Sequence, residues 1–340
     1  MVQESIQKKI QEMVMTQQDK VKYLSSLVEE RLIPLIDHDY VLYGLPYYSN
    51  IGDTLIWEGE LELLKKVHFK CKGVCGWDEY PAENVAGDNI ILIQGGGYFG
   101  DVWRNAWQNV LDGIRQYKNN RIIMLPFSIF YNNEKLREAD ANYLSTFQHL
   151  TICARDSYSY EYARKHFKNE VLLVPDTAFC INRSYLDRWT VSPTEKVLLL
   201  KRCDKELVSD NIIIPETNVE VRDWPTIESM NDKEIRFQKI IKKLKKAQRK
   251  LPQLKSFFRK IEDELYYRFY RKEMTSRGVS FVSSYNKVYT TRLHVLILSV
   301  LLGKEVYLID NSYGKLSGCY DTWLKDVEGV YVFMNDRNVN

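Results

Sequence analysis

The segment Ile90–Asp101, IILIQGGGYFGD, joins a short apolar run to three consecutive glycines, an aromatic pair, a fourth glycine and an aspartate. The apolar run is typical of a buried strand, and the glycines predict a tight turn whose backbone can approach a ligand closely. Counted from Gly95, the spacing also matches G-x-G-x-x-G, the dinucleotide-binding pattern. A helical pattern follows at residues 103–117, so the segment predicts one strand, turn and helix unit of a parallel α/β sheet.

The rest of this unit argues against a nicotinamide cofactor. In a dinucleotide-binding unit an acidic residue at the end of the next strand holds the ribose, but here that strand, RIIMLPFS, ends in Pro126, Phe127 and Ser128. The pattern also normally opens the first unit of its domain, whereas an earlier strand and helix precede this one. We therefore expect no bound cofactor, and the backbone N–H groups of Gly95, Gly96 and Gly97 remain candidates for binding a phosphate.

The alternation of strands and helices continues along all 340 residues, a length that favours two domains. We expect a first Rossmann-like domain over 1–185, with a leading helix at 3–33, and a second over 186–340, both doubly wound and facing a cleft. In such sheets ligands bind beyond the carboxyl ends of the strands. Strands are expected at 41–43, 90–94, 121–125, 151–154, 171–174, 196–200, 285–290 and 305–309, and further helices at 54–66, 133–149, 157–167 and 292–302.

The composition indicates a folded protein, with 45% apolar residues. The N-terminal residues carry charges throughout and contain no apolar signal region, and the longest apolar run, 295–302, is far below the ~18 residues of a membrane span. Six cysteines fit a reducing compartment. Cys71 and Cys75 have no second ligand pair, so we expect no metal site. The lack of a signal region and of a membrane span predicts a cytoplasmic protein.

A strongly basic segment interrupts the second half of the chain. Residues 236–272 hold 14 Lys and Arg against 3 acids, a local charge of +11, which leaves −8 for the rest of a chain whose net charge is +3. Around Pro252 the sequence reads as two amphipathic helices, within a helical region at 231–273. A solvated helix face and peripheral contact with anionic lipid on the inner face of the cell membrane are equally good explanations. Because no nucleic-acid motif accompanies the charge, we expect no nucleic-acid partner.

Two loops that follow strands carry candidate site residues. In YYSNIGDTLIWEG, Gly52 permits close backbone approach, while Asn50 and Asp53 are polar groups that could face the cleft, with Asp53 a candidate base. The same residues could equally be turn and cap chemistry. In ICARDSYSYEYA, Arg155 ends a strand and offers a planar fork for a carboxylate or phosphate, or pairs with Asp156.

The most specific stretch is YTTRLHVLILSVLLGKEVYLIDNSYGKLSG, in which Arg292 and His294 open an almost wholly apolar helix. Positive groups at the N-terminus of a buried helix oppose the helix dipole, so they require a nearby anion. Lys315, after the next strand, could bring a further positive charge to the same rim.

These stretches, together with ILIQGGGYFGDVW, VPDTAF and the continuation GCYDTW, resemble in order and spacing the motifs of bacterial polysaccharide pyruvyl transferases, over roughly residues 40–335. The resemblance implies a glycosyltransferase-B-like pair of domains. It implies phosphoenolpyruvate as donor substrate, a sugar or lipid-linked oligosaccharide as acceptor, and a pyruvate ketal as product. Residues 236–272 match no motif of the family.

The resemblance and the residue chemistry together predict three groups of site residues. Phosphoenolpyruvate carries a phosphate and a carboxylate, and protonation of its vinyl carbon followed by deprotonation of sugar hydroxyls requires an acid and a base. We expect His294 and Asp53 to be catalytic, the donor to bind at Arg155, Arg292, Lys315, Gly95, Gly96 and Gly97, and the acceptor at Asn50, Tyr98 and Asp101.

Two other functions remain open from the residues. A nucleotide-sugar-dependent glycosyltransferase could use the same fold and predicts stabilisation by a nucleoside diphosphate. A non-catalytic membrane-bound scaffold of polysaccharide assembly could rely on the basic helices alone.

Overall fold

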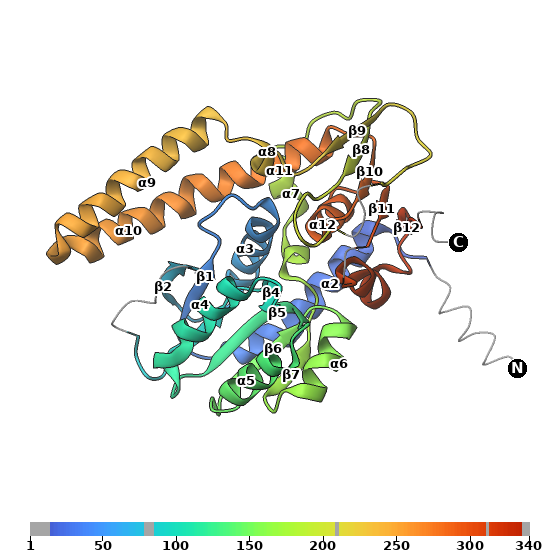
Figure 1. Cartoon of the computed structure of the whole chain (residues 1–340). Coiled ribbons are helices and arrows are strands. Elements are labelled where there is room, and N and C mark those ends of the chain that lie inside the picture. The colour runs from blue at the N-terminus through green and yellow to red at the C-terminus, as the bar shows by residue number, and fades with distance from the viewer. Residues whose placement is uncertain (1–13, 78–84, 208–210, 311–312, 335–340) are drawn as a thin grey trace, which may run out of the picture.

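The structure, a computed structural model, describes residues 14–77, 85–207, 211–310 and 313–334 and contains two parallel β-sheets (Figure 1). The first sheet has the order β2-β1-β3-β5-β6-β7, with β4 paired to β5, and the second has the order β12-β11-β10-β8-β9. The first sheet consists of β1 (Tyr40–Leu45), β2 (Cys71–Gly76), β3 (Ile90–Ile93), β4 (Gly96–Gly100), β5 (Ile122–Phe130), β6 (Leu150–Ala154) and β7 (Glu170–Leu173).

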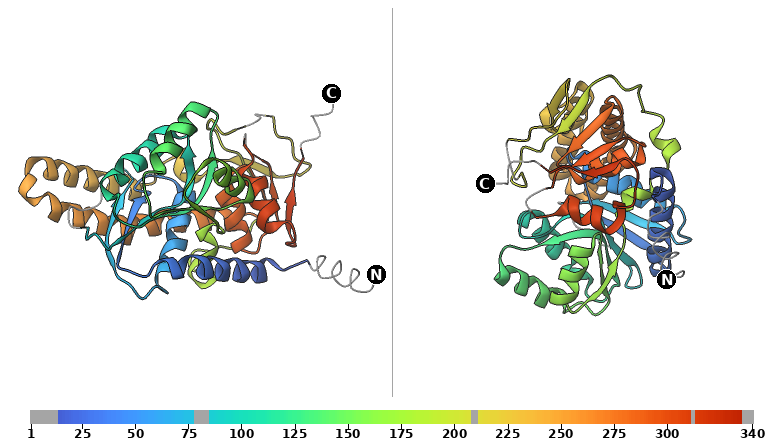
Figure 2. Two further views of the ribbon diagram at one scale, coloured as in Figure 1. Left: turned by 90° about the horizontal axis from the view of Figure 1, so that it is seen from below. Right: turned by 90° about the vertical axis from the view of Figure 1, so that its right-hand side faces the viewer.

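Helices cover both faces of the first sheet, because successive strand residues point to opposite sides and both sets are apolar. Ile91 and Ile93 of β3 pack with α4 (Arg104–Ile114), α5 (Glu134–Leu144) and α6 (Ser157–His166). Ile90 and Leu92 face α2 (Gln17–Leu32) and α3 (Ile51–Leu64). Helix α2 also runs on beneath the second sheet, as Figure 2 shows, and joins the two cores.

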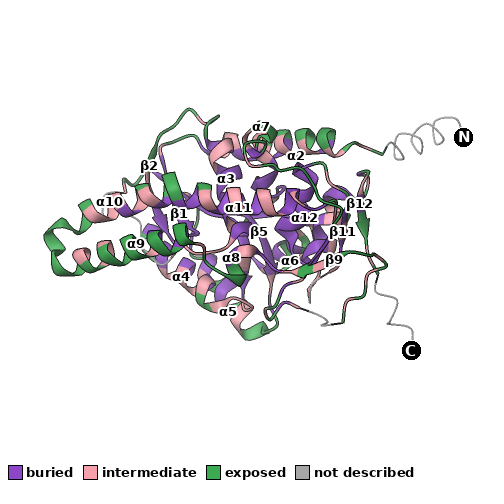
Figure 3. Ribbon diagram, turned by 90° about the horizontal axis from the view of Figure 1, so that it is seen from above, coloured by how far each residue is buried: buried purple, intermediate pink, exposed green. Residues whose placement is uncertain are grey.

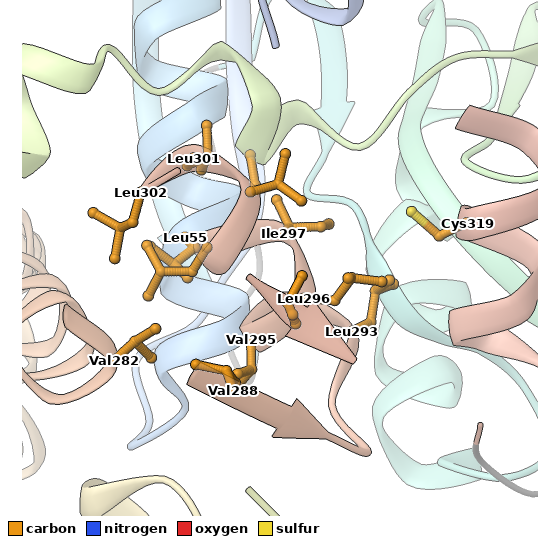
Figure 4. Packing of buried hydrophobic residues seen from close by; sticks show 14 of the residues in the cluster. Leu55, Val282, Val288, Leu293, Val295, Leu296, Ile297, Leu301, Leu302 and Cys319 are labelled. Carbon is orange, nitrogen blue, oxygen red and sulfur yellow. The ribbon is translucent and has the colours of Figure 1, made fainter. Parts of the chain in front are cut away.

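The second sheet packs one face on a buried helix. Its strands are β8 (Val197–Leu200), β9 (Val219–Arg222), β10 (Lys287–Thr290), β11 (Val306–Leu308) and β12 (Val330–Val332), and the nearby helices are α7 (Arg183–Leu186), α8 (Pro225–Glu228), α11 (Arg271–Ser283), α12 (Leu293–Leu301) and α13 (Lys315–Cys319). All nine residues of α12 are buried. Leu55 of α3, Val282 of α11 and Val288 of β10 belong to the same cluster (Figure 4), so this core also holds the two sheets together.

The opposite face of the second sheet differs from the expected doubly wound arrangement. In the described part of the chain, Leu199 and Tyr289 pack there with Ile212, Ile214 and Phe333, which belong to irregular segments and not to helices. The rings of Tyr289 and Tyr307 stack on this face at 4.5 Å. Within the described residues, only the first sheet is covered by helices on both sides.

The basic segment forms a helical hairpin that projects from the body (Figure 1, yellow and orange). Helix α9 (Asp232–Lys250) and helix α10 (Lys255–Leu265) form its two arms, and α10 continues through a π-helical turn at Tyr266–Tyr270 into α11. The apolar side of the hairpin packs with residues of the first sheet's core, where Tyr47 stacks on Tyr266 at 4.0 Å between ring centroids. The hairpin thus contacts the first sheet, although the second-domain boundary at 186 places it with the second; that boundary stays a prediction.

The expected mixed α/β class with parallel sheets is confirmed. Each expected strand is present, although β5 runs on to Phe130, and β2, β4, β9 and β12 were not expected. Helix α2 begins at Gln17 behind the N-cap Thr16, and the expected helical residues 3–13 lie outside the described residues. No helix in the described ranges is long and apolar enough to cross a membrane.

Candidate active site

A cavity of about 390 Å³ lies where strands of both sheets end. Its charged walls come from segments that directly follow strands: Asp53 after β1, Arg155 after β6, Arg202 after β8, Arg292 after β10 and Lys315 after β11. Residues that follow parallel strands lie at one edge of their sheet, which we call the strand-end rule. Here both sheets contribute such residues to one cavity.

Eight of the expected site residues line this cavity. They are Asn50, Asp53, Gly97, Tyr98, Arg155, Arg292, His294 and Lys315. Gly95, Gly96 and Asp101 are not part of its lining. The strand-end rule therefore brings together residues up to 265 positions apart, from Asn50 to Lys315.

The first turn of α3 fixes the carboxylate of Asp53. Asn50 is the N-cap, and its Oδ1 accepts hydrogen bonds from the backbone N–H groups of Gly52 (2.9 Å) and Asp53 (3.4 Å). Asp53 Oδ2 accepts from Asn50 Nδ2 at 2.7 Å and from the Tyr48 hydroxyl at 2.8 Å. The cap chemistry and the site chemistry of this loop are therefore carried by the same residues.

His294 is held by a buried carboxylate that it shares with an arginine. Asp176 Oδ2 lies 3.3 Å from His294 Nε2 and accepts a hydrogen bond from Arg155 Nη1 at 2.8 Å. Burial alone would raise the pKa of Asp176, but the hydrogen bond and charge of His294, with the charge of Arg155, lower it well below its usual range. The carboxylate therefore stays ionised, and it orients the ring so that Nδ1 is the nitrogen left for a ligand.

Gly52 allows His294 to sit against α3. A Cβ on Gly52 would lie 2.7 Å from His294 Nδ1 and 3.2 Å from His294 Cβ. Both distances are below normal contact, so only glycine leaves space for this ring position.

We expect Gly52→Ala to displace the imidazole and lower turnover at least tenfold, with a stability loss of about 1–3 kcal/mol for the overpacking. Steady-state kinetics and chemical denaturation would measure the two effects. Gly73→Ala is the matched control, because nothing lies within 4 Å of its Cβ. Full activity of Gly52→Ala would show that the ring position is not needed.

The charge of Arg292 is neutralised by carboxylates of the protein itself. Its Nη2 donates to Asp223 Oδ2 at 2.6 Å, its Nε donates to Asp223 Oδ1, and Asp204 Oδ2 lies 3.4 Å from Nη2. The expectation that positive groups at the start of α12 need an anion is met by these carboxylates, so it does not by itself require a ligand. Nη1 of Arg292 has no hydrogen-bond partner in the described parts of the chain and can still donate to a ligand.

Lys315 crosses the cavity to the glycine segment. Its Nζ donates to the Gly97 carbonyl at 3.0 Å and to Glu206 at 3.1 Å, and Glu206 also accepts from Trp103 Nε1 at 2.6 Å. Burial lowers the pKa of Lys315 to about 8, against the opposing effect of Glu206. Arg202 donates to the same carboxylate, so one glutamate neutralises two cations.

The glycine segment is a strand and not the expected open turn. Pro126 in β5 has no N–H, the pairing of β5 with β6 shifts register between Met124 and Phe127, and the pairing of β4 with β5 shifts between Gly96 and Phe99. The pairing of β3 with β5 thus ends at Ile93 and resumes when Gly96 pairs with Phe127 as part of β4.

This arrangement corrects the expected role of Gly95. Its N–H donates to Glu60 Oε1 at 3.0 Å and is not free for a phosphate, and a Cβ there would lie 2.5 Å from the Pro126 carbonyl oxygen. Gly97 faces the cavity, and a Cβ on it would lie 2.5 Å from Lys315 Nζ and 3.2 Å from Arg155 Nη2. Gly95 therefore serves packing, whereas Gly97 leaves room for two cations.

Asp101 and Tyr98 make internal contacts. Asp101 Oδ2 accepts the backbone N–H groups of Asn132 and Asn133, 2.8 and 2.7 Å away, and so fixes the loop before α5. The Tyr98 hydroxyl donates to the Gln94 carbonyl at 3.0 Å, while its side chain borders the cavity.

Several functional candidates were missed from the sequence. Asp176 stands in VPDTAF just beyond β7, and Arg202, Asp204 and Glu206 stand just beyond β8, so the strand-end rule could have found all four. Trp77 and Trp103 line the cavity without any local signal in the sequence. Within the described residues, no three His, Cys, Asp or Glu side chains gather as metal ligands.

These features define an α/β protein with a charged ligand cavity at the carboxyl ends of two parallel sheets. A family model described as polysaccharide pyruvyl transferase matches residues 50–313, and the chain belongs to this family.

Relatives agree with this assignment, and a solved structure shares the fold. EpsO of Bacillus subtilis (strain 168), which carries the provisional name of a pyruvyl transferase, is 32% identical over 310 residues, 88% of this chain and 91% of EpsO. Pyruvyl transferase 1 of Schizosaccharomyces pombe (strain 972 / ATCC 24843) is 26% identical, covering 86% of this chain and 72% of its own. A crystal structure of a functionally uncharacterised protein from Klebsiella pneumoniae subsp. pneumoniae NTUH-K2044 matches with a TM-score of 0.60 at 16% identity, over 92% and 98% of the chains, and shares the fold.

Proposed function

We propose that the chain transfers the enolpyruvyl group of phosphoenolpyruvate to a sugar of a polysaccharide precursor, lipid-linked in the cell, and forms a pyruvate ketal. The observation that carries the proposal is the grouping around Asp176 and Gly97. His294 and Arg155 share the Asp176 carboxylate, and Arg155 and Lys315 both reach the bare backbone of Gly97. A proton donor thus lies in one cavity with cations suited to a phosphate and a carboxylate.

In this proposal the donor binds to arginine N–H groups that are not used by ion pairs within the protein. Arg155 uses Nε for Ser128 and Nη1 for Asp176, which leaves Nη2, beside Gly97, without a partner among the described residues. Arg292 Nη1 is the second such donor, and Lys315 adds a charge close to Arg155 Nη2. Because the carboxylates hold these cations in place, their geometry exists before the donor arrives.

Ketal formation adds one proton to C3 of phosphoenolpyruvate and removes one proton from each of two sugar hydroxyls. C3 of phosphoenolpyruvate takes a proton from His294 as one sugar hydroxyl oxygen bonds to C2. The bond between C2 and the phosphate oxygen then breaks, inorganic phosphate leaves, and a second sugar hydroxyl oxygen bonds to C2. Asp53 takes the proton of the first hydroxyl and passes it to the departing phosphate, and the proton of the second hydroxyl restores His294. The net balance places one proton on the methyl carbon and one on the phosphate.

Aromatic side chains supply a surface for the acceptor sugar. Tyr48, Trp77 and Trp103 line the cavity, and the rings of Tyr48 and Trp77 meet edge to face at 5.8 Å. Apolar sugar faces pack well on such rings, whereas hydroxyls need polar partners such as Asn50 and Asp53. We place the acceptor between these aromatic residues and the start of α3, and do not include Asp101.

Donor use should depend on the charge of Lys315. As the pH rises through about 8, Lys315 loses its proton, so the attraction for the anionic donor falls. We expect kcat/KM for phosphoenolpyruvate to drop by up to about tenfold per pH unit above that value, while Lys315→Arg, which stays charged, should lack this part of the decrease. A pH series of initial rates from 7 to about 10 measures this. Identical profiles for both proteins would remove Lys315 from the donor site.

The two sheets facing one cavity support the glycosyltransferase-B-like arrangement that we propose.

A panel of ligands tests the proposed function. Phosphoenolpyruvate should raise the melting temperature of the wild-type chain, and Arg292→Gln should abolish the shift. Stabilisation by a nucleoside diphosphate and not by phosphoenolpyruvate would favour a nucleotide-sugar glycosyltransferase instead.

A further inference from the structure

Among the described residues, the tip of the hairpin is the longest continuous exposed stretch, and it contains both charged and large apolar side chains. Every residue from 249 to 257, RKLPQLKSF, is exposed, and the region is uniformly green at the end of α9 and α10 in Figure 3. Leu251 is 40%, Leu254 43% and Phe257 58% exposed. Large apolar side chains in such a cluster are costly in water unless another surface covers them.

The charge of α9 continues from this tip along one face. Lys239, Lys243, Lys246 and Lys250 are exposed and recur at helical spacing, with Ile240 among them at 48% exposure. The opposite side holds Phe237 and Ile241 in the core, so the basic face cannot turn inward. This is the pattern of an interfacial helix, with cations at head-group level and apolar groups below them.

The root of the hairpin is fixed to the body of the protein. Tyr47 donates to Asp263 Oδ1 at 2.9 Å, and Gln248 Nε2 donates to Glu262 Oε2 at 2.7 Å between the two arms. Phe237 stacks on Tyr270 at 4.7 Å. The tip is therefore held away from the body in a set direction, and does not fold back on it.

We propose that the hairpin is a membrane-docking element that binds an anionic phospholipid surface, with Leu251, Leu254 and Phe257 entering the head-group region and the α9 lysines contacting lipid phosphates. The local charge of +11 over 236–272, in a chain whose remainder carries −8, directs this end toward a negative surface. The inference stands independently of the proposed function, because binding to lipid needs no turnover. If both hold, docking brings the cavity to a lipid-linked acceptor.

Vesicle flotation tests this with the 340-residue chain. It should bind vesicles of phosphatidylcholine with phosphatidylglycerol, bind phosphatidylcholine alone weakly, and dissociate as salt is raised. Replacing Lys246, Lys250 and Lys255 by Gln should weaken binding on the order of 100-fold. Phe257→Ala combined with Leu254→Ala should also release the protein, and activity on a water-soluble hexoside should not change.

Matched variants elsewhere control for charge and apolar area. Lys118, Lys168 and Lys325 are exposed off the hairpin, and their replacement by Gln should leave vesicle binding intact. Ile213→Ala, at a position 58% exposed, is the control for the apolar pair. Equal binding to neutral vesicles, or no effect of the tip variants, overturns the proposal. A tip variant that changes the oligomeric state in light scattering, with lipid binding unaltered, would assign this surface to a second copy of the chain.

Discussion

His294→Ala should lower kcat by roughly 100- to 10,000-fold, the range for loss of a general acid. The ring is 9% exposed, its Nε2 is taken by Asp176, and Gly52 leaves Nδ1 a space that no other residue at position 52 would allow. Without the imidazole, no group in this position can protonate the vinyl carbon of the donor. Rapid assays of phosphate release at saturating donor measure kcat directly.

Two further histidine variants serve as a control and as a test of whether His294 transfers a proton. His149→Ala, at an exposed histidine outside the cavity, should retain full activity. His294→Gln keeps a hydrogen-bonding side chain but cannot donate a proton at neutral pH, so it should be nearly as slow as His294→Ala. Recovery of most activity in His294→Gln would mean that the residue positions the substrate and does not transfer a proton.

Asp176→Asn should have the largest effect on stability, with a loss of about 3–5 kcal/mol, because it removes the carboxylate from a buried ion pair. The side chains of Arg155 and Asp176 are each only 3% exposed. The change would leave the Arg155 charge buried beside a neutral amide and would release His294. Equilibrium unfolding in urea, followed by tryptophan fluorescence, measures the loss.

An exposed pair provides the comparison, since Arg183 and Asp187 are 48% and 53% exposed and Asp187→Asn should cost less than about 1 kcal/mol. The pH dependence follows from the lowered pKa of Asp176. Its stabilisation is fully present above the ordinary aspartate value of 3.8 and is lost as the pH falls through the lower folded value. The difference between wild type and Asp176→Asn should therefore shrink in acid. Equal costs for the two asparagine variants at neutral pH would contradict the buried-pair account.

The strand and helix order could be predicted because it depends on local apolar patterns. Strand Ile90–Ile93 is a continuous apolar run and Leu150–Ala154 is apolar except for Thr151, as is typical of parallel strands buried on both faces. The glycine strand Gly96–Gly100 could not be predicted, since its extended conformation comes from pairing with β5 beyond Pro126 and not from its own residues. Strand β2, with exposed Cys71 and Lys72, is equally weak as a local pattern.

The site could be predicted as far as the strand-end rule reaches. It brings Asp53, Arg155, Arg292 and Lys315 to one cavity, although their pairing partners are invisible in the sequence. That Asp223 neutralises Arg292, 69 residues away, depends on how two loops of the second sheet meet. For the same reason the sequence could not show that Glu60 occupies the N–H of Gly95, because that contact is made between α3 and the strand edge.

The most direct test of the central claim is phosphate release from phosphoenolpyruvate by the purified chain, measured with and without a hexoside that has two neighbouring hydroxyls. The account predicts release only when the acceptor is present, in equal amount to a pyruvate ketal detected by NMR, and its loss in His294→Ala. Release that is independent of the acceptor, or undiminished in His294→Ala, would contradict the account.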